Sequence, residues 1–286
     1  MKKILSCILI CIFIAGCSNI QSDVEEASPS LEPVSGGTLK IHSYSPDTLN
    51  PLFTQNGANS RMLKLIFEGL IKCNEQQYPV PVLAESYNVS SDGLLWTINV
   101  KRNVKWHDGS DFTAYDVEGT LYSILSGKYP SVYMKDFANV SKISCPGDYT
   151  IQIRLKTPQT NFINLLDVPI VKQRQSGIKD DFEPVGTGPY VYVKMENKSI
   201  YLESNKNWWG ENVPYIEQVE VKLLPDKNTS IFAYEAKEID VVTTDMLNWG
   251  RYSGNSENEI SEYPSGNFNF ISLNLTNQYL QNKEIR

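Results

Sequence analysis

Histidine is scarce in this sequence, with only His42 and His107 among 286 residues. This count argues against a metal site built mainly on imidazole ligands. A serine–histidine–aspartate triad would also need one of these two residues. The motifs of α/β-hydrolases (GxSxG), zinc proteases (HExxH), P-loop NTPases and dinucleotide-binding proteins (GxGxxG) do not occur either. The sequence therefore contains no recognisable enzyme signature.

An excess of basic charge is also missing. The chain has 26 lysines and arginines against 33 aspartates and glutamates, which gives a formal net charge of −7. Proteins that bind nucleic acid need a basic face to neutralise phosphates. The charge balance thus argues against nucleic acid as a partner. With 41% apolar residues, the composition is that of an ordinary globular protein.

Cysteine is sparse beyond the N-terminal segment. Three of the five cysteines lie within the first seventeen residues, and only Cys73 and Cys145 follow. Their spacing excludes a zinc ribbon or a CxxC redox site. Two cysteines in so long a chain are more often free and buried than paired, although an exported protein permits a disulfide between them.

The N-terminus has the pattern of a lipoprotein signal peptide. A basic start, MKK, precedes the apolar run ILSCILICIFI, which is shorter than the roughly 20 residues that span a bilayer. The run ends in IAGC, residues 14–17, which resembles the bacterial lipobox. We therefore predict a signal peptide at 1–16, a lipid on Cys17 and a flexible acidic tether from there to residue 36. The alternatives are an ordinary cleaved signal peptide with an incidental cysteine, and a retained transmembrane anchor.

Beyond the tether, the patterns of short strands and helices are interspersed. Apolar residues alternate along 149–155, which predicts an antiparallel hairpin with the preceding strand. Helical spacing predicts one helix over 59–70, capped by Asn59 or Ser60, and another that begins near a capping box of Thr113 and Asp116 and stops at Gly127. Mixed short strands and helices indicate an α/β or α+β architecture with mixed sheets. Further predicted elements are a helix over 228–238 capped by Asn228 or Thr229, and strands at 38–44, 189–195, 199–204 and in IDVVTT (239–244).

The segment HDGSD, residues 107–111, is a candidate for metal binding or acid–base chemistry. It does not fit the ligand pattern of an EF-hand. The structural alternative is a tight turn made by Asp108 and Gly109, with Asp111 near the start of a helix, where carboxylates are favoured. We favour the structural interpretation.

Several motifs occur in an order that one protein family shares. On these residues, from about Gly36 to its end, the sequence resembles the family 5 solute-binding proteins, the oligopeptide, dipeptide and nickel receptors of ABC importers. The sequence differs slightly from the usual pattern of this family in two places. TINV stands where a Thr-Phe pattern is commoner, and WW stands where Tyr-Trp is usual. The motifs, in order, are GGTLKI, LNPL, IFEGL, PVLAESYNVSSDGLLWTINVKRNVKWHDGSDFTAYDVEGTL, GTGPY, NWWG and AKEIDVV.

The resemblance implies an α/β, periplasmic-binding-protein-like fold with mixed sheets. Such a protein is a clamshell of type II, in which two lobes close over a ligand by a hinge motion. The core of the N-terminal lobe would comprise 37–56 and 182–268, with an inserted subdomain at 57–181. Residues 269–286 would be the hinge strand and the start of a second lobe that is absent from this sequence.

The candidate ligand residues follow from a general property of open α/β sheets, which bind ligands at loops after the carboxyl ends of strands. We expect Ser43, Tyr44 and Ser45 after the first strand, and Thr244 and Trp249 after IDVV, to line one wall of the cleft. Tyr44 or Trp249 can stack on a peptide or a flat ligand. The alternative is that these five residues only pack the hinge face. Four other tryptophans are expected to be structural, namely Trp96, Trp106, Trp208 and Trp209.

The predicted function is the lipid-anchored, substrate-binding component of an ABC importer. It would be a monomer on the outer face of the membrane that captures a peptide or related small solute and delivers it to the permease, without catalysis, metal or cofactor. The alternative is a half-length surface lipoprotein without transport activity that acts as an interaction protein. An extracellular hydrolase, the third possibility, would need a nucleophile and a base in reach of each other. The choice among peptide, nickel, haem and sugar ligands stays open.

Overall fold

The strands within the described residues form three sheets. The computed structural model describes residues 33–74, 76, 78–243, 250, 252–254, 258–261, 276 and 278–281. All elements named below belong to the unit Ser35–Arg286. Three residues of the sequence predictions, Cys17, Thr244 and Trp249, lie outside the described residues.

The first sheet joins the start of this unit to segments far along the sequence. Strand β1 (Gly36–Ser43) pairs in parallel with β10 (Ile216–Leu223). Antiparallel pairing then adds β9 (Ser199–Ser204) and β8 (Tyr190–Glu196), so the order is β1-β10-β9-β8. Apolar residues such as those at 219 and 221 are buried while their neighbours are not, as expected for a sheet with one face in the core. The predicted mixed sheet is thereby confirmed.

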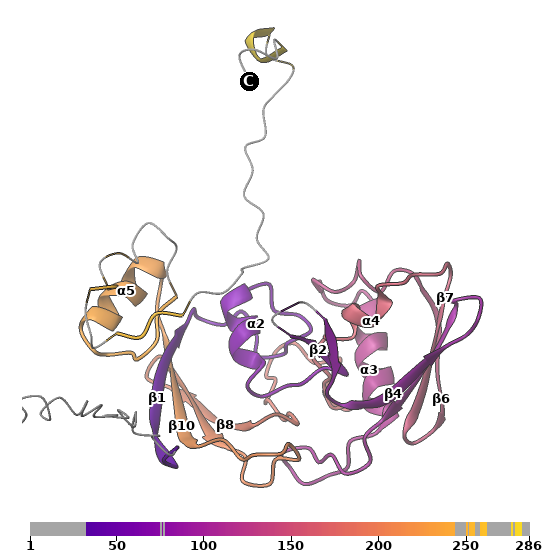
Figure 1. Cartoon of the computed structure of the whole chain (residues 1–286), viewed down its shortest axis with the longest axis horizontal. Helices are drawn as coiled ribbons and strands as arrows, with labels where there is room; N and C mark the ends of the chain where they lie inside the picture. The colour runs from indigo at the N-terminus through magenta and orange to yellow at the C-terminus, as the bar shows by residue number, and fades with distance from the viewer. Residues whose placement is uncertain are drawn as a thin grey trace, which may run out of the picture. The chain divides into compact units, whose positions relative to one another are not determined.

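The second sheet is antiparallel throughout. It contains β4 (Ala84–Val89), β5 (Leu95–Val100), β7 (Thr150–Leu155) and β6 (Val140–Gly147), in the order β4-β5-β7-β6. Buried and accessible side chains alternate along β7, which confirms the predicted hairpin of β6 and β7. Helix α3 (Ala114–Leu125) packs against β6 and β7 (Figure 1).

Helix α3 begins and ends as the sequence predicts. The backbone N–H of Thr113 donates to Oδ2 of Asp116 over 2.9 Å, and the Thr113 hydroxyl takes part in the same capping box. Ser126 is the C-cap, and Gly127 follows with φ +66°, a left-handed conformation that favours glycine.

Helix α2 (Gly57–Leu63) is shorter than the predicted helix over 59–70, and its cap differs. The Oδ1 of Asn56 accepts hydrogen bonds from the N–H groups of residues 58 and 59. Asn59 is instead buried and donates its side-chain amide to the carbonyl of Thr48 over 2.7 Å. The helix ends early because the carbonyls of Leu65 and Ile66 accept hydrogen bonds from Tyr190 and from Gly188, on a distant loop.

Helix α5 (Lys227–Glu235) is also capped by a residue that the sequence pattern did not indicate. Asp226 accepts a hydrogen bond from the N–H of Thr229 over 2.8 Å, so the predicted caps Asn228 and Thr229 are wrong. The cap lies two residues before the first predicted one, because α5 already begins at Lys227. The described part of the predicted strand in IDVVTT, residues 239–243, has no strand assignment.

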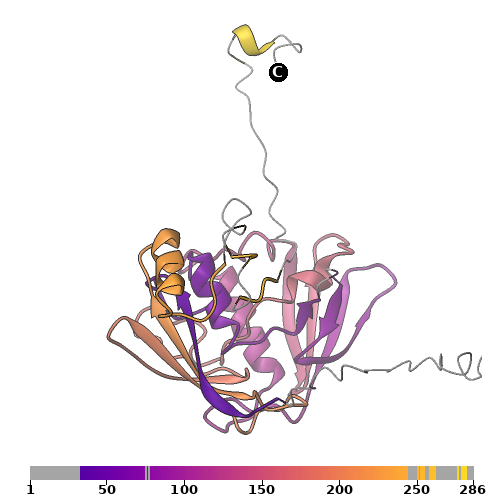
Figure 2. The ribbon, with the colours of Figure 1, turned by 60° about the vertical axis from the view of Figure 1, so that its left-hand side comes forward.

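In the described part of the chain, one hydrophobic core contains residues from both four-stranded sheets. Figures 1 and 2 show the strands β1, β8 and β10 on one side of this unit and β4 to β7 on the other, with α2 between them. Within the described residues, no helix combines the length and apolar character needed to span a membrane. The smaller elements are β2 (Ile71–Cys73), β3 (Pro79–Pro81), α4 (Phe162–Leu165) and the 3-10 helix η2 (Gln278–Gln281).

Candidate functional site

The end of β1 holds three of the predicted ligand residues. Ser43 is fully buried, and its Oγ has no hydrogen-bond partner among the described residues. Its carbonyl accepts a hydrogen bond from Leu224 over 2.9 Å, which fixes the strand end against the residue after β10. Tyr44 is half-buried, and Ser45 is exposed. Tyr44 and Ser45 are therefore accessible at this strand end, as ligand residues must be, while Ser43 is not.

The segment that leads to Thr244 meets the same strand. The N–H of Lys40 donates to Oδ2 of Asp240, and the N–H of Asp240 donates to the carbonyl of Lys40, each over 2.7 Å. Asp240 therefore lies against β1 through both backbone groups of Lys40. The two predicted groups of ligand residues thus follow neighbouring segments, although the positions of Thr244 and Trp249 stay a prediction.

His42 and Arg61 add titratable and basic character near this strand end. The rings of His42 and Tyr44 are 6.4 Å apart, edge to face. Partial burial lowers the pKa of His42, a backbone contact with Val241 opposes this, and the nearby Arg61 lowers it further. At neutral pH His42 is therefore uncharged, and the exposed Arg61 is a cation near this strand end.

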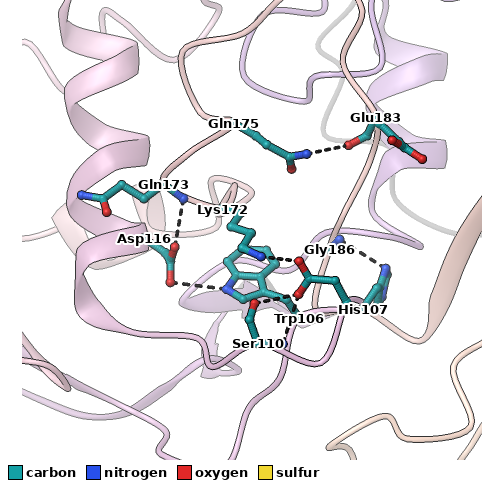
Figure 3. Close-up of polar contacts among 10 residues, drawn as sticks. Trp106, His107, Ser110, Asp116, Lys172, Gln173, Gln175, Glu183 and Gly186 are labelled. Atoms are coloured by element: carbon teal, nitrogen blue, oxygen red, sulfur yellow. Dashed lines mark hydrogen bonds and ion pairs between the residues drawn. The ribbon is translucent and has the colours of Figure 1, made fainter.

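His107, in the HDGSD segment, is a structural link to the loop GTGPY (186–190). Its Nδ1 accepts a hydrogen bond from the N–H of Gly186 over 3.2 Å (Figure 3). This leaves Nε2 to donate to the carbonyl of Gly188 over 3.0 Å. Burial lowers the pKa of His107 despite the opposing effects of Gly188 and Asp108. The imidazole is thus neutral and uses both nitrogens to hold a backbone loop.

The Asp108–Gly109 turn is present as predicted. Gly109 has φ +82°, and Oδ1 of Asp108 accepts hydrogen bonds from the N–H and the hydroxyl of Ser110. Asp108 also forms an ion pair with Lys172. Burial raises the pKa of Asp108, but Lys172 and Ser110 together bring it to about 2. Its carboxylate is committed to the turn and the ion pair.

The remaining carboxylates of this region are engaged as well. Oδ2 of the buried Asp116 accepts a hydrogen bond from the indole of Trp106 over 3.4 Å, and its Oδ1 accepts one from the N–H of Gln173 over 2.9 Å (Figure 3). Asp111 pairs with the exposed Lys105. It lies near the start of α3, two residues before the N-cap Thr113, while Asp116 is the carboxylate in the first turn. No group of three or more His, Cys, Asp or Glu residues in the described part of the chain could hold a metal ion.

A half-buried carboxylate that the sequence patterns did not single out is Glu68, in the motif IFEGL. Its Oε2 accepts hydrogen bonds from the hydroxyl of Thr187 and from the indole of Trp209, each over 2.9 Å. Burial raises the pKa of Glu68 to about 7, although Thr187, Trp209, Trp208 and Lys101 all lower it. Glu68 therefore joins the segment after α2 to the GTGPY loop and to the loop of Trp208 and Trp209, both more than a hundred residues further along the sequence.

The four tryptophans expected to be structural divide into two pairs. Trp96 and Trp106 are buried in the core. Trp208 and Trp209 are only half-buried, and their rings lie 6.0 Å apart. The ammonium of Lys101 also lies over the ring of Trp209, 4.3 Å from the ring centroid. The second pair thus lines accessible space, which the sequence pattern did not indicate.

Comparison with known proteins gives the following matches. The family model for the bacterial extracellular solute-binding proteins, family 5 (middle portion), matches residues 78–286. The oligopeptide-binding protein AppA of Bacillus subtilis is 26% identical over 294 aligned residues, which cover 97% of this chain and 54% of AppA. The glutathione-binding protein GsiB of Salmonella choleraesuis is 28% identical over 251 residues, which cover 84% of this chain and 48% of GsiB.

Comparison with solved structures also gives a match to an oligopeptide-binding protein. The structure of Bacillus subtilis AppA in complex with a nonapeptide matches with a TM-score of 0.66 and 27% identity, over 73% of this chain and 44% of that one. The predicted periplasmic-binding-protein-like fold with mixed sheets is confirmed by this similarity. The chain spans about half the length of the relatives it matches.

Proposed function

The chain belongs to the family 5 bacterial extracellular solute-binding proteins, and on this premise we propose that it is the substrate-binding component of an ABC importer. It would capture a peptide or a related small solute and deliver it to the permease, without catalysing a reaction. The observation that carries this proposal is the match to an oligopeptide-binding protein along 97% of the chain. Peptide is the ligand class that this relative favours.

The proposed mechanism is capture between two lobes. A first lobe with the core 37–56 and 182–268 and an insert at 57–181 would supply one wall, at the end of β1 and after residue 243. The facing wall would come from a second lobe, because the relatives are about twice as long as this chain. The ligand would stabilise the closed state by contacting both walls. Tyr44 and Trp249 would supply stacking area, with Ser43, Ser45 and Thr244 beside them.

We expect alanine at Tyr44 or Trp249 to weaken capture of a peptide by about tenfold each, because a buried aromatic anchor contributes most of its affinity through contact area. The measurement is retention of a random hexapeptide pool by the native lipoprotein from its source cells, with bound peptide quantified by mass spectrometry. Tyr78→Ala is the matched control, since Tyr78 is 68% exposed and lies away from β1. Equal retention by all three variants and the parent would overturn this assignment of the wall.

We also propose that Cys17 carries a lipid that anchors the protein to the membrane as a monomer. The mass of the native lipoprotein tests this together with the question of length. We expect an N-terminal diacylglyceryl cysteine on a species close to twice the 32.4 kDa of this chain. A lipidated species no heavier than this chain would instead support the half-length interaction protein, and the transport proposal would fail. An unmodified N-terminus would contradict the anchor alone.

A further inference from the structure

A cavity of about 610 Å³ lies between the end of α2, the hairpin of β2 and β3, and the loop of Trp208 and Trp209. None of the predicted ligand residues at the end of β1 lines it. Its volume is within the range of sites that hold small molecules. The walls are mainly apolar and include Phe67, Ile71, Val80, Pro81, Val82 and Pro189.

Glu68 is one of three carboxylates that line this cavity, together with Asp167 and Glu211. Both of its hydrogen bonds, from Thr187 and Trp209, end on Oε2. Its second oxygen, Oε1, accepts no hydrogen bond from the described residues. The indole N–H of the neighbouring Trp208 is buried and also lacks a bond of normal geometry. Oε1 is thus the oxygen of Glu68 that has capacity to accept a hydrogen bond from a ligand, and the Trp208 indole, which lowers the pKa of Glu68, lies beside this carboxylate.

The other charges around the cavity nearly cancel. Lys64 is paired with Asp167 over 2.9 Å, and Lys72 and Glu211 bring one charge of each sign. Lys101 lies against Trp209 and lines an adjoining cavity of about 520 Å³. The Glu68 carboxylate therefore gives the cavity interior its local negative charge.

We propose that this cavity binds a small primary ammonium group carried on an apolar body. The ammonium would donate to Oε1 of Glu68, and the body would rest on the valine, proline and indole walls. A hydrogen bond between two charged groups is among the strongest that proteins form, and indole faces attract cations. This site lies outside the wall proposed for the transported solute, so the inference does not rest on the proposed function.

Isothermal titration of the full chain with benzylamine tests the proposal. Burial raises the pKa of Glu68 to about 7, and the ammonium needs the ionised carboxylate. The affinity for benzylamine should therefore rise by about tenfold per pH unit between pH 5 and 7 and level off above. Benzyl alcohol, a neutral probe of the same shape, should bind at least about tenfold more weakly than benzylamine at pH 8.

Two variants complete the test. Glu68→Gln should weaken benzylamine binding by at least about tenfold at pH 8 and abolish its pH dependence. Glu85→Gln is the matched control, since Glu85 lines the adjoining cavity only, and it should bind like the parent. Equal binding of the amine and the alcohol, a flat pH profile of the parent chain, or absence of benzylamine binding would each overturn the proposal. The pH profile needs no variant, so a folding defect in Glu68→Gln cannot obscure the result.

Discussion

Gly186→Ala is expected to prevent the chain from folding to its native state. A Cβ at this position would lie 1.8 Å from the carbonyl oxygen of Ile66 and 2.6 Å from its carbon, where no atom can be accommodated. The loop cannot move away from Ile66, because the N–H of Gly188 donates a hydrogen bond to the carbonyl of Ile66 over 2.9 Å. His107 also forms hydrogen bonds with both the N–H and the carbonyl of Gly186. We expect a loss of more than about 4 kcal/mol in the free energy of unfolding. This is comparable to the whole stability of many domains.

Urea unfolding followed by tryptophan fluorescence measures this effect. Gly147→Ala is the matched control, because a Cβ at Gly147 would meet nothing within 4 Å and its φ is not positive. We expect that control to change the free energy of unfolding by no more than about 0.5 kcal/mol. A soluble Gly186→Ala protein with the urea midpoint of the parent would show that the GTGPY loop does not press on the end of α2.

Sequence patterns predict a helix or strand correctly where residues close by in the sequence determine its ends. The capping box of Thr113 and Asp116 and the stop at Gly127 each depend on residues within one helical turn, and α3 has both. The alternation of apolar and polar residues along β7 likewise depends only on which side chains of that strand are buried. The apolar pattern overextends helix α2 because the end of that helix is set by hydrogen bonds from residues 188 and 190, which no local pattern reveals.

The sequence predicts the candidate site only in the part that lies directly after the end of a strand. The loop after β1 could be located from the strand pattern and the general behaviour of α/β sheets. Glu68 could not, because its significance arises from Thr187 and Trp209, more than a hundred residues away. Its motif, IFEGL, indicates only part of a helix and of the family resemblance. The GTGPY loop needs glycine at positions 186 and 188 because its backbone lies in close contact with Ile66. Ile66 is also more than a hundred residues away in the sequence, so no local pattern indicates this need.

Glu68→Gln is expected to stabilise the protein at alkaline pH and to leave it nearly unchanged at acid pH. Burial raises the folded-state pKa of Glu68 from 4.5 to about 7. Between these values the folded state holds a proton that the unfolded state has lost, so stability falls as pH rises through this window. A shift of this size corresponds to about 3 kcal/mol above pH 7. Glutamine keeps an oxygen for the donors of Thr187 and Trp209 but cannot ionise, and so avoids this loss.

The measurement is the free energy of unfolding of the parent and Glu68→Gln in urea at pH 5, 6, 7 and 8. The difference between the two proteins isolates Glu68, since His42 and His107 have lowered pKa values and destabilise both equally as pH falls below about 6.5. Glu85→Gln, at an exposed carboxylate, should follow the parent at every pH. Parallel curves for Glu68→Gln and the parent would mean that Glu68 ionises in the folded protein as easily as in the unfolded chain. Its carboxylate would then either be well solvated, or the hydrogen bonds from Thr187 and Trp209 would fully offset the effect of burial on its pKa.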